Sequence, residues 1–154
     1  MRVITLVFAL AVVSACATPT HAHARAAPNA IASCLASAEP DARRDCIGIV
    51  AGPCMDEPGG ESTAGSMMCH LRERDLWQAQ AETLAALLRA RESSLQVQHM
   101  EAMLAAHEPW MQARCSYSAL YFEGGSLARV AAAGCLRTTT AELAIDLLER
   151  FDEG

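Results

Sequence analysis

The stretch SMMCHLRERDLWQAQAETLAALLRARES, residues 66–93, decides the fold class. It contains neither glycine nor proline, and it is rich in Leu, Ala, Glu, Gln and Arg, which are strong helix formers. Four apolar residues recur at steps of 4, 3 and 4, which places them on one helical face: Trp77, Ala81, Leu84 and Leu88. The polar residues are expected in water on the other faces: Arg72, Glu73, Gln80 and Arg91. The stretch therefore predicts one long helix with an apolar face toward a core.

A second helix is expected from Leu95 to about Tyr121. It carries two adjacent apolar stripes: Met100, Leu104, His107 and Met111 in one, and Met103, Trp110, Tyr117 and Tyr121 in the other. Trp110 is expected to join Trp77 in the aromatic packing of the core. Because Pro109 lacks a backbone donor and clashes with the preceding turn, we expect a kink at 104–108 or two abutting helices.

A third helix is expected from Leu127 to about Phe151, after the turn Glu123-Gly124-Gly125-Ser126. The two glycines are expected to take positive φ and end the second helix, and Ser126 is expected to cap the third. No segment alternates at a period of two, so the predicted fold class is all-α. We expect an antiparallel helical hairpin plus a returning helix, in a small bundle stapled by disulfides.

The chain divides into three predicted parts: residues 1–24, 25–53 and 54–151. Residues 25–53 are expected to form a cysteine-containing extension, with one short helix near Ala30–Ser37 and another, capped by Asp41, through Ile49. Residues 51–65 are rich in glycine and proline and are expected to form a loop. The helical domain then occupies residues 54–151.

Residues 1–24 have the pattern of a secretory signal peptide, with Arg2 before an apolar run that is too short to span a bilayer. Ala22-His23-Ala24 and Ala15-Cys16-Ala17 are alternative cleavage sites. Val13-Ser14-Ala15-Cys16 resembles a bacterial lipobox, in which residues 1–15 would be the lipoprotein signal and Cys16 the lipidated residue. A periplasmic or secreted protein is expected, with a membrane-anchored lipoprotein as the alternative.

Six cysteines remain once Cys16 is removed or lipidated: Cys34, Cys46, Cys54, Cys69, Cys115 and Cys135. An even number in an exported chain predicts three disulfides. The Gly124-Gly125 turn would make the second and third helices antiparallel, which favours Cys115–Cys135. Cys34–Cys46 and Cys54–Cys69 follow as local pairs. Alanine-rich faces bury little area each, so the fold is expected to depend on these cross-links, at about 2–4 kcal/mol each.

Charge and motif content exclude several functional classes. The chain has 12 basic and 18 acidic residues, and removal of residues 1–24 takes away Arg2 and no acid, leaving 11 − 18 = −7. This charge argues against nucleic-acid binding and favours a cationic partner. Cysteine and histidine spacing gives no zinc motif, and no nucleophile motif is present. We expect no enzymatic activity, no metal, no cofactor and no transmembrane helix in the mature chain.

Several ordered features together resemble the LprI-type lysozyme-inhibitor N-terminal domain family, which comprises small exported helical bacterial proteins. The matching positions are Cys69, Glu73 and Trp77, then Trp110 and Arg114, then Tyr121-Phe122-Glu123-Gly124-Gly125-Ser126, and finally Cys135 with Thr139 or Thr140. Three positions depart from the family pattern: His107 replaces the usual Gln, Pro109 lies inside the helix, and Cys115 directly follows Arg114.

The resemblance implies binding rather than catalysis. A lysozyme inhibitor would act by occlusion, with an acidic loop docking near the substrate cleft of a cationic lysozyme. The candidate partner-binding residues are Asp56, Glu57, Glu61 and Glu123. The alternative is a structural or interaction module of the bacterial envelope that has no lysozyme target.

Overall fold

The computed structural model describes residues 29–154, so the expected signal segment and Cys16 lie outside the described residues. The elements, in chain order, are α1 (Ala30–Ser37), the 3-10 helix η1 (Pro40–Cys46), α2 (Ala51–Met55), α3 (Thr63–Arg91), α4 (Ser94–Ala119), the 3-10 helix η2 (Leu120–Phe122) and α5 (Ser126–Asp152). The described part of the chain contains helices and turns and no strand, which confirms the all-α prediction.

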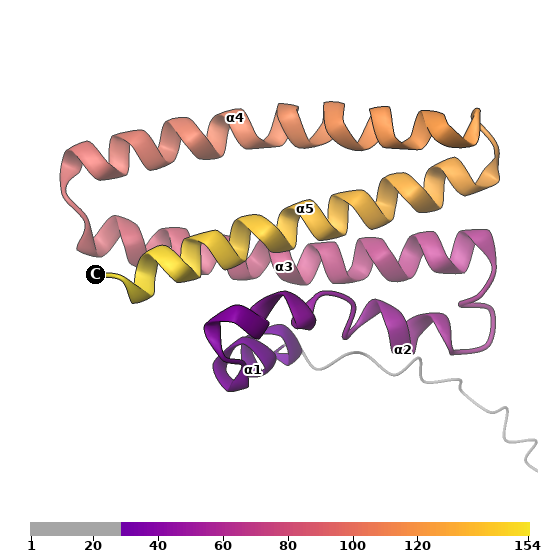
Figure 1. Ribbon diagram of the computed structural model, residues 1–154, viewed down its shortest axis with the longest axis horizontal. Coiled ribbons are helices and arrows are strands. Elements are labelled where there is room, and N and C mark those ends of the chain that lie inside the picture. The colour runs from indigo at the N-terminus through magenta and orange to yellow at the C-terminus, as the bar shows by residue number, and fades with distance from the viewer. Residues whose placement is uncertain (1–28) are drawn as a thin grey trace, which may run out of the picture.

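The three long helices form the bundle (Figure 1). α3 and α4 are antiparallel, and α5 returns and packs against both of them, with its closest approach to α3. The segment from α1 to α2 covers α3 on the side away from α4 in Figure 1, and η1 also contacts α5. The predicted hairpin with a returning helix is therefore confirmed, with an N-terminal layer added to it.

The core lies between α1, α3 and α5, and α4 contributes little to it. Trp77 is fully buried at the centre, and the face predicted from residues 66–93 is buried along its whole length. Its partners on α5 include two alanines beside two larger aliphatic residues: Ala141, Ala144, Ile145 and Leu147. Small side chains allow close approach of the two helices but bury little apolar area each.

Two serines define where the long helices begin. The Ser62 side chain accepts a hydrogen bond from the Gly65 backbone N–H at the start of α3, 3.0 Å away. Ser93 and Gln96 form a capping box at the start of α4, which separates α4 from α3. The expected Ser126 cap is wrong, because Gly125 is the N-cap residue of α5 and makes no side-chain bond.

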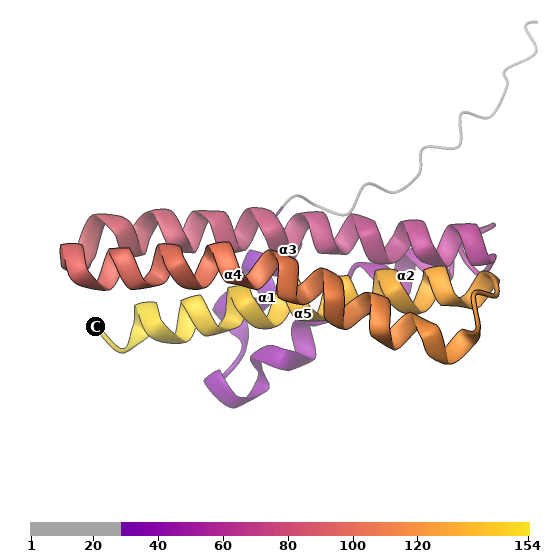
Figure 2. The ribbon, with the colours of Figure 1, turned by 90° about the horizontal axis from the view of Figure 1, so that it is seen from above.

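Pro109 does not divide the second helix. α4 is continuous through it, so the alternative of two abutting helices is wrong. Figure 2 shows the axis of α4 changing direction near its middle. Ala105 and Pro109 are both exposed, so water can solvate the carbonyl that loses its donor.

The N-terminal layer differs from its prediction in two places. α1 has the expected bounds, but the next element is a 3-10 helix that ends at Cys46, and Asp41 lies in its first turn instead of capping it. The short helix α2 occupies the start of the expected loop. Pro53 lies in its first turn, where proline is tolerated because the backbone N–H that it lacks would have no partner within the helix.

The three disulfides join Cys34 to Cys46, Cys54 to Cys69, and Cys115 to Cys135. These are the pairs that the sequence predicted. The first two cross-link the N-terminal layer, internally and to α3. The third joins α4 to α5, with the Cα atoms 5.4 Å apart.

The second apolar stripe of α4 does not face the core. Met100 and Met111 of the first stripe are buried, whereas Met103, Trp110, Tyr117 and Tyr121 of the second are 44%, 53%, 77% and 87% exposed. The expectation that Trp110 packs in the core is therefore wrong, because α5 covers only one face of α4.

Candidate functional site

The turn between α4 and α5 forms an exposed aromatic tip, which we define as Leu120, Tyr121, Phe122, Glu123 and Leu127. Leu120, Tyr121 and Leu127 are well exposed, and the rings of Tyr121 and Phe122 meet edge to face with their centroids 5.4 Å apart. Large apolar side chains this exposed at the end of a bundle indicate a contact surface.

The backbone of the tip has a fixed conformation. Glu123 is left-handed, with φ of 48°, and Gly124 follows with φ of 74°. The Glu123 N–H donates to the Leu120 carbonyl over 2.9 Å, and the Gly125 N–H donates to the Phe122 carbonyl over 2.8 Å. The sequence correctly predicted positive φ at Gly124, but the same expectation for Gly125 is wrong, because its φ is −61°. It did not indicate that Glu123 shares the left-handed conformation, which is rare for a residue with a side chain.

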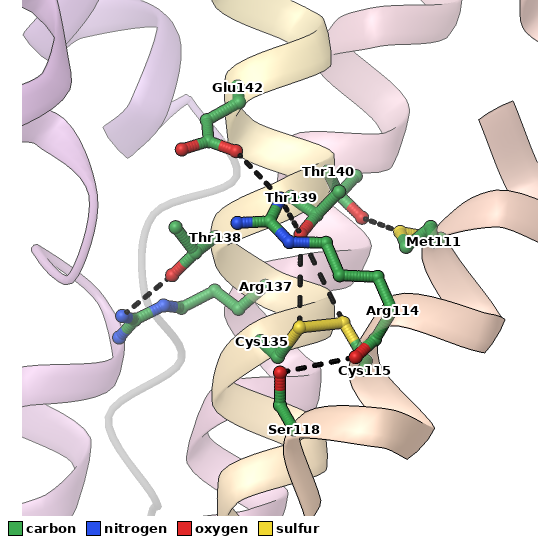
Figure 3. The surroundings of a disulfide bond; sticks show 10 residues. All are labelled: Met111, Arg114, Cys115, Ser118, Cys135, Arg137, Thr138, Thr139, Thr140 and Glu142. Carbon is green, nitrogen blue, oxygen red and sulfur yellow. Dashed lines mark hydrogen bonds and ion pairs between the residues drawn. A yellow bond between two sulfur atoms is a disulfide. The ribbon is translucent and has the colours of Figure 1, made fainter.

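The Cys115–Cys135 disulfide lies behind the tip and ties its two flanking helices together (Figure 3). Arg114 reinforces this joint, because its guanidinium donates to Thr139 Oγ1 over 3.2 Å and lies 3.4 Å from a Glu142 carboxylate oxygen. A covalent joint this close to the turn limits the relative motion of the two helices. The tip is therefore presented in a preorganised form.

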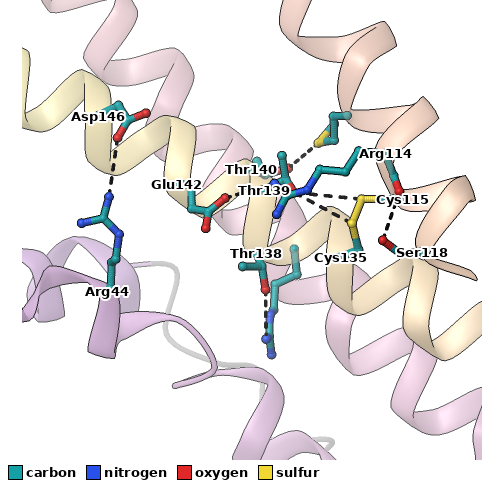
Figure 4. A network of polar contacts seen from close by, with 12 residues as sticks. Arg44, Arg114, Cys115, Ser118, Cys135, Thr138, Thr139, Thr140, Glu142 and Asp146 are labelled. Carbon is teal, nitrogen blue, oxygen red and sulfur yellow. Dashed lines mark hydrogen bonds and ion pairs between the residues drawn. A yellow bond between two sulfur atoms is a disulfide. The ribbon is translucent and has the colours of Figure 1, made fainter.

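α5 makes polar contacts on two sides (Figure 4). Toward α4 it offers Thr139 and Glu142 to Arg114, and toward the N-terminal layer Asp146 lies 3.9 Å from Arg44 of η1. Partial burial raises the pKa of Asp146, an effect increased by Glu149 and Glu142 and opposed by Arg44. Arg43 forms a second ion pair with Asp152, so η1 is held to α5 at two points.

The predicted partner-binding acids lie in two turns at one end of the bundle. Asp56, Glu57 and Glu61 belong to the turn between α2 and α3, and Glu123 belongs to the tip; both turns lie at the right end in Figure 1. The α2–α3 turn is tightly packed, because a Cβ on Gly65 would lie 2.0 Å from the Gly59 carbonyl oxygen. Asp56 and Glu61 are exposed, and Glu57 is partly buried.

A pocket of about 370 Å³ lies beside the tip. Phe122 and Leu127 line it together with His70 of α3 and Arg137 of α5. Partial burial and the nearby Arg137 lower the pKa of His70, and Glu73 opposes this shift. Because a guanidinium can only donate, the 3.3 Å contact between Arg137 Nη1 and His70 Nδ1 requires an unprotonated Nδ1.

Glu73, which was expected in water, is fully buried, so that prediction is wrong. Its carboxylate accepts hydrogen bonds from the backbone N–H groups of Gly48, Val50 and Ala51 at 2.7, 3.0 and 2.6 Å, and from the Trp77 indole at 3.1 Å. Arg137 lies 4.0 Å from it. The carboxylate thus anchors the N-terminal layer to α3. A signal was present in the sequence, because Glu73 lies four residues before Trp77 and therefore on the predicted apolar face of the helix.

Residues 29–154 contain no group of three or more His, Cys, Asp or Glu side chains that could hold a metal ion. No helix within the same residues is long and apolar enough to cross a membrane.

Comparisons with known proteins do not place the chain in a family. No protein-family model matches the chain. No curated protein and no solved structure matches it either.

Proposed function

We propose that this protein is an exported binding protein of the bacterial envelope, and that the aromatic tip and the neighbouring acidic turn dock onto a cationic protein. The observation that carries the proposal is the exposed tip with Glu123 beside Tyr121, preorganised by the Cys115–Cys135 disulfide. A rigid convex element with an aromatic anchor suits insertion into a cleft, and tyrosine is enriched among residues that dominate binding energy.

Lysozyme is the first target to test. The resemblance to the LprI-type family supports it, and so does the net charge of −7 after removal of residues 1–24, because acidic charge speeds encounter with a basic protein. The three disulfides support residence in an oxidising compartment. In this proposal the protein occludes the substrate cleft and performs no chemistry itself.

The test is an assay of bacterial cell-wall lysis with the purified oxidised protein. We expect the lysis rate to fall as the protein is added, and the inhibition to weaken as salt screens the charges. Tyr121→Ala should weaken inhibition by about 5- to 30-fold, because truncating a central aromatic anchor commonly removes about 1–2 kcal/mol.

Two charge variants distinguish an effect of Glu123 at the tip from an effect of the net charge of the protein. Glu123→Gln removes one acid at the tip, keeps the side-chain size, and should weaken inhibition. Glu82→Gln removes one acid from the exposed middle of α3 and should leave inhibition unchanged. Absence of inhibition at micromolar excess in low salt would overturn the lysozyme proposal and favour the alternative, an envelope interaction module.

A further inference from the structure

α4 carries an apolar stripe that its own fold leaves uncovered, which we call the outer stripe. Its members are all exposed: Leu95, Met103, Ala106, Trp110, Ala113 and Tyr117, with His99 between the first two. At 100° per residue the stripe lies roughly 130° around the helix from the buried residues Met100, Met111 and Cys115. α4 therefore has two apolar faces, and α5 covers only one.

The spacing of the outer stripe is that of a coiled-coil seam. Met103, Trp110 and Tyr117 recur at intervals of seven, and alanines follow the first two by three residues, at Ala106 and Ala113. Positions a and d of a heptad repeat have this spacing, and they serve to pack one helix against another. The expected occupant of the stripe is therefore another helix.

The charges near the outer stripe indicate which kind of helix can pack on it. Glu101 of α4 is paired with Arg89 of α3, away from the stripe, and Glu108 is bonded to Gln112. The cation at the edge, Arg114, lies over the Trp110 ring at 5.3 Å. A basic partner would find no acid among the stripe residues, whereas two copies of the stripe would bring no like charges together.

The sizes of the side chains also favour a second copy of α4 as the partner of the stripe. If two α4 helices run antiparallel about a two-fold axis near Glu108, Trp110 of each copy faces Ala106 of the other, and Met103 faces Ala113. In these two pairs a large residue opposes a small one. In this register Tyr117 meets His99, beside a groove of about 450 Å³ lined by Leu95, Met103 and Leu147.

We propose that the outer stripe is a self-association surface, on which two copies pack α4 against α4 in this antiparallel register. From Leu95 to Tyr117 the stripe is about 33 Å long at 1.5 Å per residue. With a helix width of about 10 Å, the stripe covers about 330 Å² on each copy and about 660 Å² on the two together, which is the size of a small, transient contact. The dimer should therefore be weak and form toward the high end of the micromolar range.

The test is sedimentation of the oxidised, exported protein from low to high micromolar concentration, together with tryptophan fluorescence. Trp77 is fully buried and Trp110 is half exposed, so Trp110 reports on the stripe. We expect the mass to double with concentration while Trp110 becomes protected from acrylamide. A monomer at every concentration overturns the proposal.

Variants test the surface and its register. Trp110→Glu should raise the dimer dissociation constant by about 30-fold or more, since loss of a central aromatic commonly costs at least 2 kcal/mol. Gln98→Glu places the same charge on α4 outside the stripe and should change nothing. Trp110→Ala and Ala106→Trp should each weaken the dimer, and the double variant should restore it, because the large residue again faces the small one.

Two further outcomes would each overturn part of the proposal. Equal dimerisation of Trp110→Glu and wild type overturns the assignment of the surface. Failure of the double variant to recover, when both single variants are impaired, overturns the antiparallel register. Because these side chains are exposed, the helical content and Trp77 emission of each variant should match the wild type.

Discussion

α4 and α5 are similar in length and in their alanine-rich composition, yet they have different places in the molecule. α5 has seven buried residues among its 27, whereas α4 has three among its 26. α5 contacts α3, α4 and η1, and α4 contacts mainly α5. A helix that touches several partners is positioned by packing, whereas one with a single partner depends on local attachments.

The attachments of α4 are few and specific. The Cys115–Cys135 disulfide holds its C-terminal part, Thr140 Oγ1 donates to Met111 Sδ over 3.4 Å, and Met100 reaches the core near the other end. The comparison shows that a disulfide can hold a helix such as α4 in place of extensive packing. The opposite face of that helix is then left uncovered by the fold.

The largest expected effect comes from the packed side of the molecule, at Glu73. Glu73→Ala leaves two buried backbone donors, one partly buried backbone donor and the Trp77 indole without their acceptor, so we expect the free energy of unfolding to fall by about 4 kcal/mol or more. Urea denaturation measures it. Glu82→Ala, on an exposed position of the same helix, is the control and should change stability by about 0.5 kcal/mol at most.

Removing the Cys115–Cys135 disulfide should affect α4 most. The double substitution to Ser opens a loop of 20 residues, and we expect a loss of about 3 kcal/mol. Hydrogen exchange should then show α4 amides losing protection before those of α3 and α5. The matched control is the Cys34/Cys46 double variant, which should loosen the N-terminal layer and spare α4. Uniform loss of protection in all three long helices would contradict the comparison.

A matched pair of Ala→Leu substitutions measures packing on the two helices. Ala141 of α5 is completely buried, so Ala141→Leu should destabilise the protein by about 1–3 kcal/mol through overpacking. Ala102 of α4 is exposed, so Ala102→Leu should change stability by less than about 0.5 kcal/mol. Thermal unfolding of both variants gives the comparison, and equal losses would show that α4 is packed as tightly as α5.

The smallest expected effect is a dependence of protein stability on pH, caused by His70 at the contact between α3 and α5. Because the pKa of His70 is lowered in the folded protein, the unfolded chain binds its proton more readily. The stabilising contribution is present above the ordinary histidine pKa of about 6.5 and is lost as pH falls through the lowered value. His70→Gln should therefore flatten the decline of stability in mild acid, measured by urea denaturation at several pH values. An unchanged decline would exclude His70 as its source.

Much of the fold could be predicted because it rests on local chemistry. The helix formers of residues 66–93 and the glycines near 124 mark where helices extend and end, and these signals act over a few residues. The disulfide pairs also followed from helix order, since an antiparallel turn brings Cys115 near Cys135. The 3-10 form of η1 and the short α2 were missed, because elements this short are decided by their contacts.

The candidate site was only partly predictable. The four acids were expected at a binding surface, and they lie in two turns at one end of the bundle. The exposed aromatic tip was missed, because the apolar residues of Tyr121-Phe122 have the same sequence pattern whether a neighbour covers them or not. His70 and Arg137, 67 positions apart, gave no signal of their contact.

Local sequence chemistry is enough to predict three long helices, a glycine turn before the last one, and cysteines placed for three cross-links. The packing of the helices sets the hydrogen-bond partners of the buried Glu73, and it makes Met100 and Met111, instead of Met103 and Trp110, face the interior. The physical reason is that helical periodicity fixes which residues share a face of one helix. Which face is covered depends on the neighbouring helices, and those neighbours are distant in the sequence.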